Sequence, residues 1–154
     1  MSQAKKVFTR MCLNNWGGID HKVLEFHEYV NLFSGKSGSG KSTVMDAIQV
    51  ILYGSFSPSF LNKAADDAKN RRSVLSYLRG EQKDGSANRK DCDFCSVIAL
   101  EIEDTGTHII TCIGIAFEVR KSDSEIKKFV YFSHSGKMPT SGYLTEQGVC
   151  YSDQ

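Results

Sequence analysis

A short glycine-rich stretch constrains this chain more than any other feature of its sequence. Residues 35–42 read Gly-Lys-Ser-Gly-Ser-Gly-Lys-Ser and fit the pattern G-x-x-x-x-G-K-[ST] at every position. Glycine adopts backbone conformations that other residues resist, so a loop of this composition can wrap closely around an anion. Because such loops join a strand to the start of a helix, the pattern also predicts what lies on either side of it.

The residues on both sides of the loop agree with that expectation. Val30–Phe33 is a short apolar segment that predicts a strand leading into the loop. A helix is expected to begin near Lys41. Five apolar residues after that point recur at helical spacing, namely Val44, Met45, Ile48, Ile51 and Leu52. Asp46 and Gln49 fall off this stripe, and Gly54 stands where a left-handed C-terminal cap is usual.

The loop predicts a binding site for the phosphates of a nucleoside triphosphate, ATP with Mg²⁺. The backbone amides from Gly38 to Thr43 are expected to point inward as an anion nest, to which the following helix adds its positive N-terminal end. Lys41 is expected to reach the β- and γ-phosphates, and the Ser42 hydroxyl to ligate Mg²⁺. The predicted nucleotide-binding residues are Gly35, Lys36, Ser37, Gly38, Ser39, Gly40, Lys41, Ser42 and Thr43.

The remaining apolar pattern predicts further strands and one more helix. The strand candidates are Val7–Leu13, Lys22–Phe26, Phe94–Glu103, Thr107–Val119 and Lys127–Phe132. Ser73–Arg79 reads as a helix that ends at Gly80, and Asn62–Lys69 as a helical turn. Asp104-Thr105-Gly106 is a hairpin signal, so the last three strands are expected to form a meander. The fold class expected is α/β, with a mixed sheet around the P-loop helix and an antiparallel meander.

Composition places few restrictions on partners. The chain has 154 residues, which is the size of one ordinary domain. Its formal net charge of +1 does not indicate a nucleic-acid or membrane partner. The apolar stretch Ile109–Phe117 is too short to span a bilayer. The five cysteines are an odd number without a secretion signal, which favours free thiols in the cytoplasm. Cys92 and Cys95 lack the second pair that zinc normally needs, and read as ordinary thiols.

The position of the loop within the chain narrows the class. About thirty residues, with two predicted strands of their own, precede Val30, whereas kinases and small GTPases usually place this loop after the first strand. A meander follows the loop rather than repeated βαβ units. This arrangement resembles the N-terminal lobe of an ABC-type ATPase head.

Four segments read together carry a more specific resemblance. They are Asn15-Trp16-Gly17-Gly18, the loop with its continuation Ser42-Thr43-Val44-Met45-Asp46-Ala47-Ile48, Asn62-Lys63-Ala64-Ala65, and Arg72-Ser73-Val74-Leu75-Ser76-Tyr77-Leu78-Arg79-Gly80. Over Val7–Phe132 the chain resembles the N-terminal head segment of SMC-like ATPases, in particular the MukB-like bacterial condensins, including the JetC component of Wadjet plasmid-defence systems.

The resemblance implies half of a split ATPase. In this family both ends of a long chain, joined by a coiled coil, build one head. The C-terminal half supplies the Walker B acidic residues and the signature motif. Two heads sandwich ATP, and hydrolysis drives loop extrusion or loading on DNA together with accessory condensin-type subunits. Residues 1–133 would form the N-terminal half-head and residues 134–154 a polar, irregular tail.

The chain shows no apolar run ending in Asp-Glu after the P-loop, no Ser-Gly-Gly signature and no heptad repeat. No catalytic residue is therefore assigned, and binding with negligible hydrolysis is expected of these residues alone. Two other families stay open. The first is an ABC transporter, because the sequence of Ser37–Thr43 is closer to the loop of ABC transporters than to that of SMC proteins. The second is a P-loop kinase, which would need an arginine-rich lid. A truncated, inert P-loop domain is the non-enzymatic alternative.

Two further features admit both a functional and a purely structural interpretation. Trp16, the only tryptophan, could contact the base or ribose, or could pack in the core. The stretch 69–90 is rich in basic residues and could contact DNA phosphates, or could be a solvated loop face. The candidate DNA contacts are Arg71, Arg72, Arg79, Lys83, Arg89 and Lys90.

Overall fold

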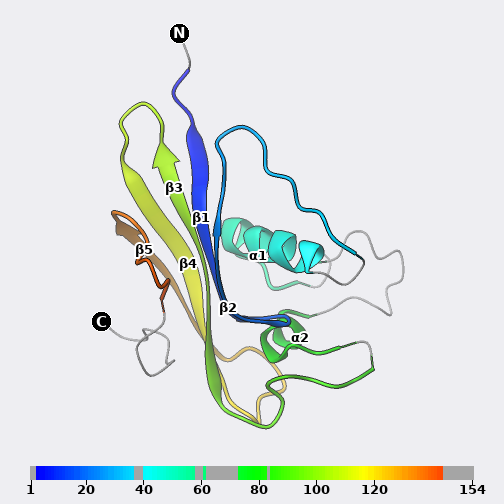
Figure 1. Cartoon of the computed structure of the whole chain (residues 1–154). Helices are drawn as coiled ribbons and strands as arrows, with labels where there is room; N and C mark the ends of the chain where they lie inside the picture. The colour runs from blue at the N-terminus through cyan, green and yellow to red at the C-terminus, as the bar shows by residue number, and fades with distance from the viewer. Residues whose placement is uncertain (1–2, 37–39, 58–60, 62–72, 83, 144–154) are drawn as a thin grey trace.

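The computed structural model describes residues 3–36, 40–57, 61, 73–82 and 84–143. The elements are β1 (Lys6–Trp16), β2 (Ile19–Glu25), α1 (Lys41–Tyr53), α2 (Val74–Arg79), β3 (Phe94–Asp104), β4 (Ile110–Val119) and β5 (Lys128–Ser135). The five strands form one sheet in the order β2-β1-β3-β4-β5, and each neighbouring pair is antiparallel. Both helices lie on the same face of this sheet (Figure 1). The expected α/β class and the β3–β4–β5 meander are confirmed.

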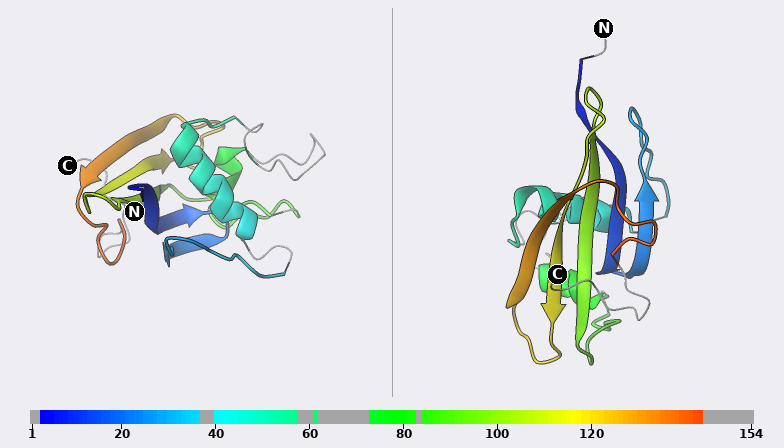
Figure 2. Two further views of the ribbon diagram at one scale, coloured as in Figure 1. Left: turned by 90° about the horizontal axis from the view of Figure 1, so that it is seen from above. Right: turned by 90° about the vertical axis from the view of Figure 1, so that its left-hand side faces the viewer.

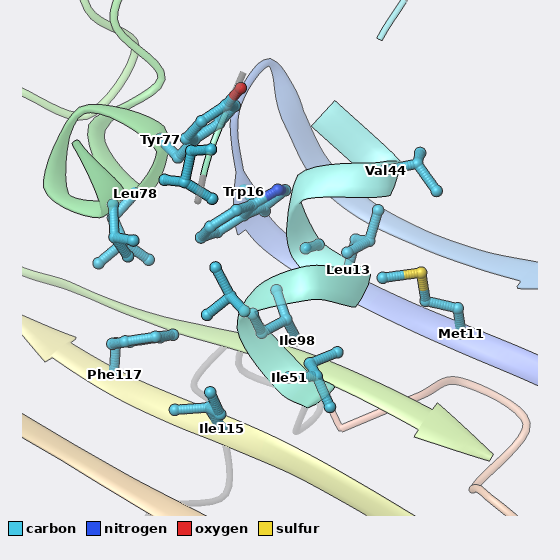
Figure 3. Packing of buried hydrophobic residues seen from close by; sticks show 14 of the residues in the cluster. Met11, Leu13, Trp16, Val44, Ile51, Tyr77, Leu78, Ile98, Ile115 and Phe117 are labelled. Atoms are coloured by element: carbon cyan, nitrogen blue, oxygen red, sulfur yellow. The ribbon is translucent and has the colours of Figure 1, made fainter. Parts of the chain in front are cut away.

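The alternation of side chains along the strands gives the sheet two different faces. On β1, Met11 and Leu13 point toward the helices, whereas Cys12 points to the opposite face. The helix-covered face holds the larger apolar core, in which Trp16 and Phe117 are buried between strands and helices (Figure 3). The P-loop helix thus rests on a platform of strands that precede and follow it in the sequence.

Helix α1 ends as the sequence predicts but buries a different set of residues. Gly54 has φ 61°, and its N–H donates to the Val50 carbonyl at 3.0 Å, which is a left-handed cap. The sheet covers a face made of Val44, Ala47, Val50 and Ile51. The expected stripe is therefore wrong in part, because Met45 and Leu52 are 46% and 49% exposed, while Asp46 is buried. Apolar residues occupy both sides of this helix, so spacing alone could not choose the buried side.

The segment before the P-loop differs from the expected strand. Residues 30–33 pair with no strand among those that the structure describes, so the sheet lacks the parallel component of the expected mixed sheet. Asn31 instead closes a local turn, since its side chain accepts from the His27 N–H at 2.7 Å and donates to the His27 carbonyl at 2.8 Å. Val30 and Leu32 are 76% and 87% exposed.

Helix α2 matches the sequence interpretation closely. The Ser73 side chain caps its N-terminus by accepting from the Ser76 N–H, and Gly80 closes its C-terminus at φ 65°. Its buried residues are Val74, Leu75, Tyr77 and Leu78. The helical turn expected at 62–69 lies outside the described residues.

The second face of the sheet is covered by residues 136–143, called here the strap (Figure 2, right). Met138 and Tyr143 of the strap are only 2% and 8% exposed and pack with Cys12 and Cys112. Residues 136–143 contain no helix or strand, as expected of the segment from residue 134, but β5 runs to Ser135 and the strap is packed against the sheet. Residues 144–154 lie outside the described part of the chain.

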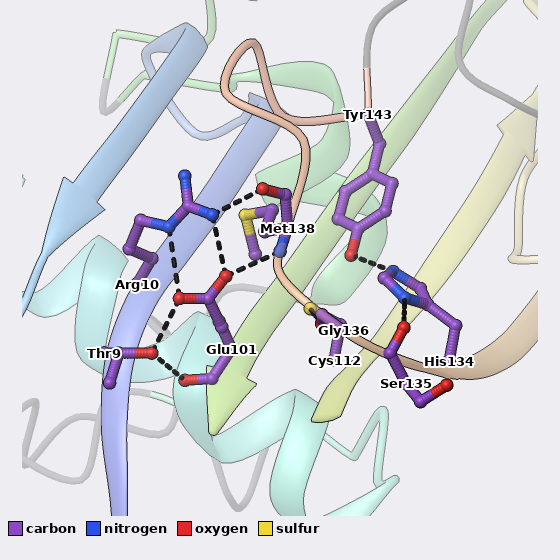
Figure 4. A network of polar contacts seen from close by, with 9 residues as sticks. All are labelled: Thr9, Arg10, Glu101, Cys112, His134, Ser135, Gly136, Met138 and Tyr143. Carbon is purple, nitrogen blue, oxygen red and sulfur yellow. Dashed lines mark hydrogen bonds and ion pairs between the residues drawn. The ribbon is translucent and has the colours of Figure 1, made fainter. Parts of the chain in front are cut away.

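A buried carboxylate fastens the strap to the sheet (Figure 4). Glu101 accepts from Arg10 at 2.7 Å, from the Thr9 hydroxyl at 2.8 Å and from the Met138 N–H at 2.5 Å. Burial alone would raise the pKa of Glu101, but the bonds from Arg10, Met138 and Thr9 outweigh it, so the pKa lies below its usual value. The strap therefore depends on an ionised Glu101.

Candidate nucleotide-binding site

The P-loop enters helix α1 through a glycine that its backbone requires. Gly40 has φ 91°, a conformation that side chains resist, and Lys41 is the first residue of the helix. Among the described residues, no side chain caps the helix at Gly40, and the first turn of the helix carries no acidic residue. The positive N-terminal end of this helix of 13 residues thus has no carboxylate in its own first turn to neutralise it.

Lys41 turns back over the loop that precedes it. Its ammonium group donates to the Lys36 carbonyl at 3.0 Å and to the Gly35 carbonyl. The next residue, Ser42, is exposed at the helix start. The cation and the hydroxyl expected to serve phosphate and Mg²⁺ therefore sit at the same end of α1. Ser37, Gly38 and Ser39 lie outside the described residues, so their predicted contacts stay predictions.

Trp16 packs between Tyr77 and the first turn of α1. Its side chain is fully buried and stacks on Tyr77 with ring centroids 4.9 Å apart and planes 6° from parallel (Figure 3). The indole N–H donates to the Thr43 carbonyl at 2.8 Å. This placement agrees with the core-packing interpretation of Trp16 and not with a base or ribose contact, because a ring enclosed by Tyr77 and α1 offers no face to a base.

Two residues to which the sequence analysis gave no individual role complete this packing. The Tyr77 hydroxyl donates to the Asp46 carboxylate, and both side chains are buried. The signal for Asp46 was its position as a charged residue on a helix that is otherwise apolar on both sides. Tyr77 gave no separate signal, because it lies within the apolar face of Val74–Leu78.

The basic stretch does not form one exposed patch. Arg89 is 7% exposed and donates to the Leu78 carbonyl at 2.8 Å and to the Gly17 carbonyl, with Asp20 at 3.0 Å. Burial lowers the pKa of Arg89, an effect that Asp20 opposes. Arg89 is therefore a structural arginine, which corrects its suggested DNA contact.

The other basic candidates have separate outcomes. Arg79 is partly buried and donates to backbone carbonyls of Lys121 and Asp123. Lys90 is exposed. Three candidates, Arg71, Arg72 and Lys83, lie outside the described residues.

The described part of the chain shows neither a metal cluster nor a membrane-spanning helix. No three His, Cys, Asp or Glu side chains there gather as metal ligands. No helix among these residues is long and apolar enough to cross a bilayer.

Residues 35–42 carry the P-loop sequence pattern, and helix α1 begins at Lys41 within it. Residues 8–68 match the family described as the P-loop containing region of AAA domain. The chain is also 39% identical over 74 residues to the C subunit of the nuclease SbcCD from Staphylococcus haemolyticus (strain JCSC1435). That match covers 46% of this chain and only 6% of the relative. Both findings confirm, for the part that they cover, that the chain is similar to the N-terminal head segment of SMC-like ABC-class ATPases.

Proposed function

We propose that residues 1–133 are the ATP-binding N-terminal half of an SMC-like ATPase head that acts on DNA. The observation that carries this proposal is the arrangement at the start of α1, where Lys41 turns over the loop at an uncapped helix end. Phosphate groups suit such an end, because backbone amides and the lysine supply positive charge together. The same arrangement fits the match to the P-loop containing region of AAA domain and the similarity to the C subunit of SbcCD.

Each residue of the site has a defined task in this proposal. The amides at 38–43 hold the phosphate oxygens, and Lys41 leaves the Gly35 and Lys36 carbonyls to pair with the β- and γ-phosphates. Ser42 is exposed at the helix end and is the residue that would hold Mg²⁺, which neutralises phosphate charge when bound. None of these groups activates a water molecule. Hydrolysis therefore needs residues from elsewhere, and we expect this chain alone to bind without turnover.

Exposed apolar side chains support the proposal that a second segment completes the head. Val30 and Leu32 stand exposed just before the P-loop. On α1, Met45, Leu52 and Tyr53 are exposed on the side away from the sheet, Tyr53 by 70%. Exposed apolar side chains that gather in a patch mark a contact that another segment covers, and we propose that these side chains form such a patch. We propose that the C-terminal half of the same head packs there, and that two completed heads enclose ATP.

The biological setting follows from the resemblance. A role with DNA and accessory condensin-type subunits, as in MukB-like and Wadjet-type condensins, is the function proposed for the complete protein in the cytoplasm. The chain spans only a small fraction of the relative that it matches. Among the suggested DNA contacts, Lys90 is the described residue best exposed for such a role.

The test is titration of the purified chain with Mg-ATP in a calorimeter. Lys41→Ala is expected to weaken binding by roughly ten- to a hundred-fold, the range for losing hydrogen bonds to a charged group. Lys90→Ala removes an exposed lysine outside the loop and serves as the matched control, with unchanged affinity expected. Equal affinity of Lys41→Ala and the wild-type chain would refute the site. Rapid hydrolysis by the wild-type chain, lost in Lys41→Ala, would refute the half-head.

A further inference from the structure

Helix α1 is held near its phosphate-binding end by side chains from two other elements. Trp16, at the end of β1, donates to the Thr43 carbonyl, and Tyr77, on α2, donates to Asp46. Thr43 and Asp46 are three residues apart and therefore lie on one side of the helix. Because Trp16 and Tyr77 also stack on each other, the two anchors form one rigid unit (Figure 3).

The backbone around this unit is closely packed at two glycines. A Cβ atom on Gly17 would lie 2.6 Å from Cγ2 of Thr43, and Gly17 has φ 59°. A Cβ atom on Gly80 would lie 2.7 Å from the Gly17 carbonyl oxygen. The Gly17 N–H in turn donates to the Tyr77 carbonyl at 2.8 Å. The β1–β2 turn, α2 and the first turns of α1 are therefore in direct contact.

Arg89 joins a third segment to the same unit. Its guanidinium group bonds to the carbonyls of Gly17 and Leu78, one in the β1–β2 turn and one in α2. The exposed carboxylate of Asp20 pairs with it at 3.0 Å. Arg89 thereby links its own segment to the β1–β2 turn. This turn follows Trp16, which bonds to Thr43.

We propose that Trp16, Tyr77 and Asp46 are positioning residues that set the orientation of the Lys41–Thr43 turn for nucleotide binding. This inference rests on the proposed function. It assigns to α2 a role that touches no nucleotide: α2 holds α1 at the angle in which Lys41 and Ser42 face the loop. Nucleotide binding and the position of α2 are then coupled, and each affects the other.

Removal of a single hydroxyl group tests the proposal. Tyr77→Phe keeps the ring that stacks on Trp16 and removes the hydroxyl that donates to Asp46. The matched control is Tyr131→Phe, which deletes a hydroxyl that donates to the Gly54 carbonyl at 3.0 Å, at the opposite end of α1. Asp46→Asn is the conservative variant, since its amide oxygen still accepts from Tyr77. The measured quantities are the Mg-ATP dissociation constant, from calorimetry and from the emission of Trp16, and the melting temperature without nucleotide.

The expected result is a roughly five-fold weaker Mg-ATP affinity for Tyr77→Phe, at the low end of typical coupling between sites. Asp46→Asn and Tyr131→Phe are expected to stay within about two-fold of wild type, on the same reasoning. A purely structural role would lower the melting temperature of Tyr77→Phe without moving its affinity, and that outcome would overturn the proposal. Equal weakening in Tyr131→Phe would overturn it too. Failure of the proposed function is seen separately, as unchanged binding in Lys41→Ala.

Discussion

The two faces of the central sheet are built by different physical means. The helix-covered face is an apolar core in which Trp16, Tyr77 and Phe117 are almost fully buried. The strap-covered face has a smaller cluster and relies on the ion pair between Arg10 and Glu101. The P-loop helix belongs to the first face, so nucleotide binding is expected to depend on apolar packing and to be indifferent to the strap. Variants on each face can test this separation.

The largest effect is expected from Trp16→Ala, on the apolar face. Removing a fully buried aromatic side chain leaves a cavity and should lower the free energy of unfolding by about 3–5 kcal/mol. It also removes the N–H that bonds to Thr43, so nucleotide affinity should fall with stability. Urea unfolding followed by circular dichroism measures the first change. A loss below about 1 kcal/mol, the size of one hydrogen bond, would show that the core does not hold α1.

Glu101→Gln tests the polar face. The variant loses the charge that pairs with Arg10, which is 18% exposed, while Glu101 is 5% exposed. We expect a loss of about 2 kcal/mol in unfolding free energy at neutral pH, less than for a fully buried pair because Arg10 retains some contact with water. Mg-ATP affinity should not change, since the strap lies on the face away from α1. A matching loss of affinity would break the separation of the two faces.

The same carboxylate predicts a pH dependence. The pKa of Glu101 is lower in the folded chain than its usual 4.5, so its ionised form stabilises the fold. This contribution is complete above about pH 4.5 and is lost as the pH falls through the lower folded pKa. The stability difference between wild type and Glu101→Gln should therefore shrink on acidification. A difference that stays constant from pH 7 to about pH 2 would contradict the assignment.

The two faces also differ in how far the sequence predicts them. The strands, α2 and the P-loop follow from apolar periodicity and a local motif, which act over a few residues. The strap was missed because Met138 and Tyr143 are isolated apolar residues in a polar stretch, and Glu101 finds Arg10 only after the sheet forms. The same reason hid the burial of Arg89. Long-range contacts of this kind leave no periodic signal.

A smaller effect is expected at Gly142, where the strap lies against Cys12 of β1. Gly142 has φ 72°, and a Cβ atom there would lie 2.6 Å from Sγ of Cys12. Gly142→Ala should cost about 1–3 kcal/mol from backbone strain and the close contact together. Gly136→Ala is the matched control, because Gly136 has φ 90° but nothing lies within 4 Å of the added atom. Equal losses in the two variants would show that the contact with Cys12 contributes nothing.

The smallest effect on the chain itself is expected from Leu32→Ala, in the exposed segment before the P-loop. Leu32 is 87% exposed, so its truncation should change the unfolding free energy by no more than about 0.5 kcal/mol. The same truncation at buried Leu13 should cost about 2–5 kcal/mol. An exposed leucine next to the P-loop is not expected to stabilise the isolated chain. We therefore propose that Leu32 is buried by a partner.

That assignment makes the two truncations diverge again when the proposed C-terminal half of the head is supplied as a separate polypeptide. Burying one leucine contributes about 1.5–3 kcal/mol, so Leu32→Ala should weaken association roughly ten- to a hundred-fold, as measured by calorimetry. Association unaffected by Leu32→Ala would mean that the second half packs elsewhere. A stability loss in the isolated chain as large as that of Leu13→Ala would mean instead that the chain covers Leu32 itself. Either result would limit the proposed contact with the second half of the head to the exposed side of α1. The segment before the P-loop would then have no proposed partner.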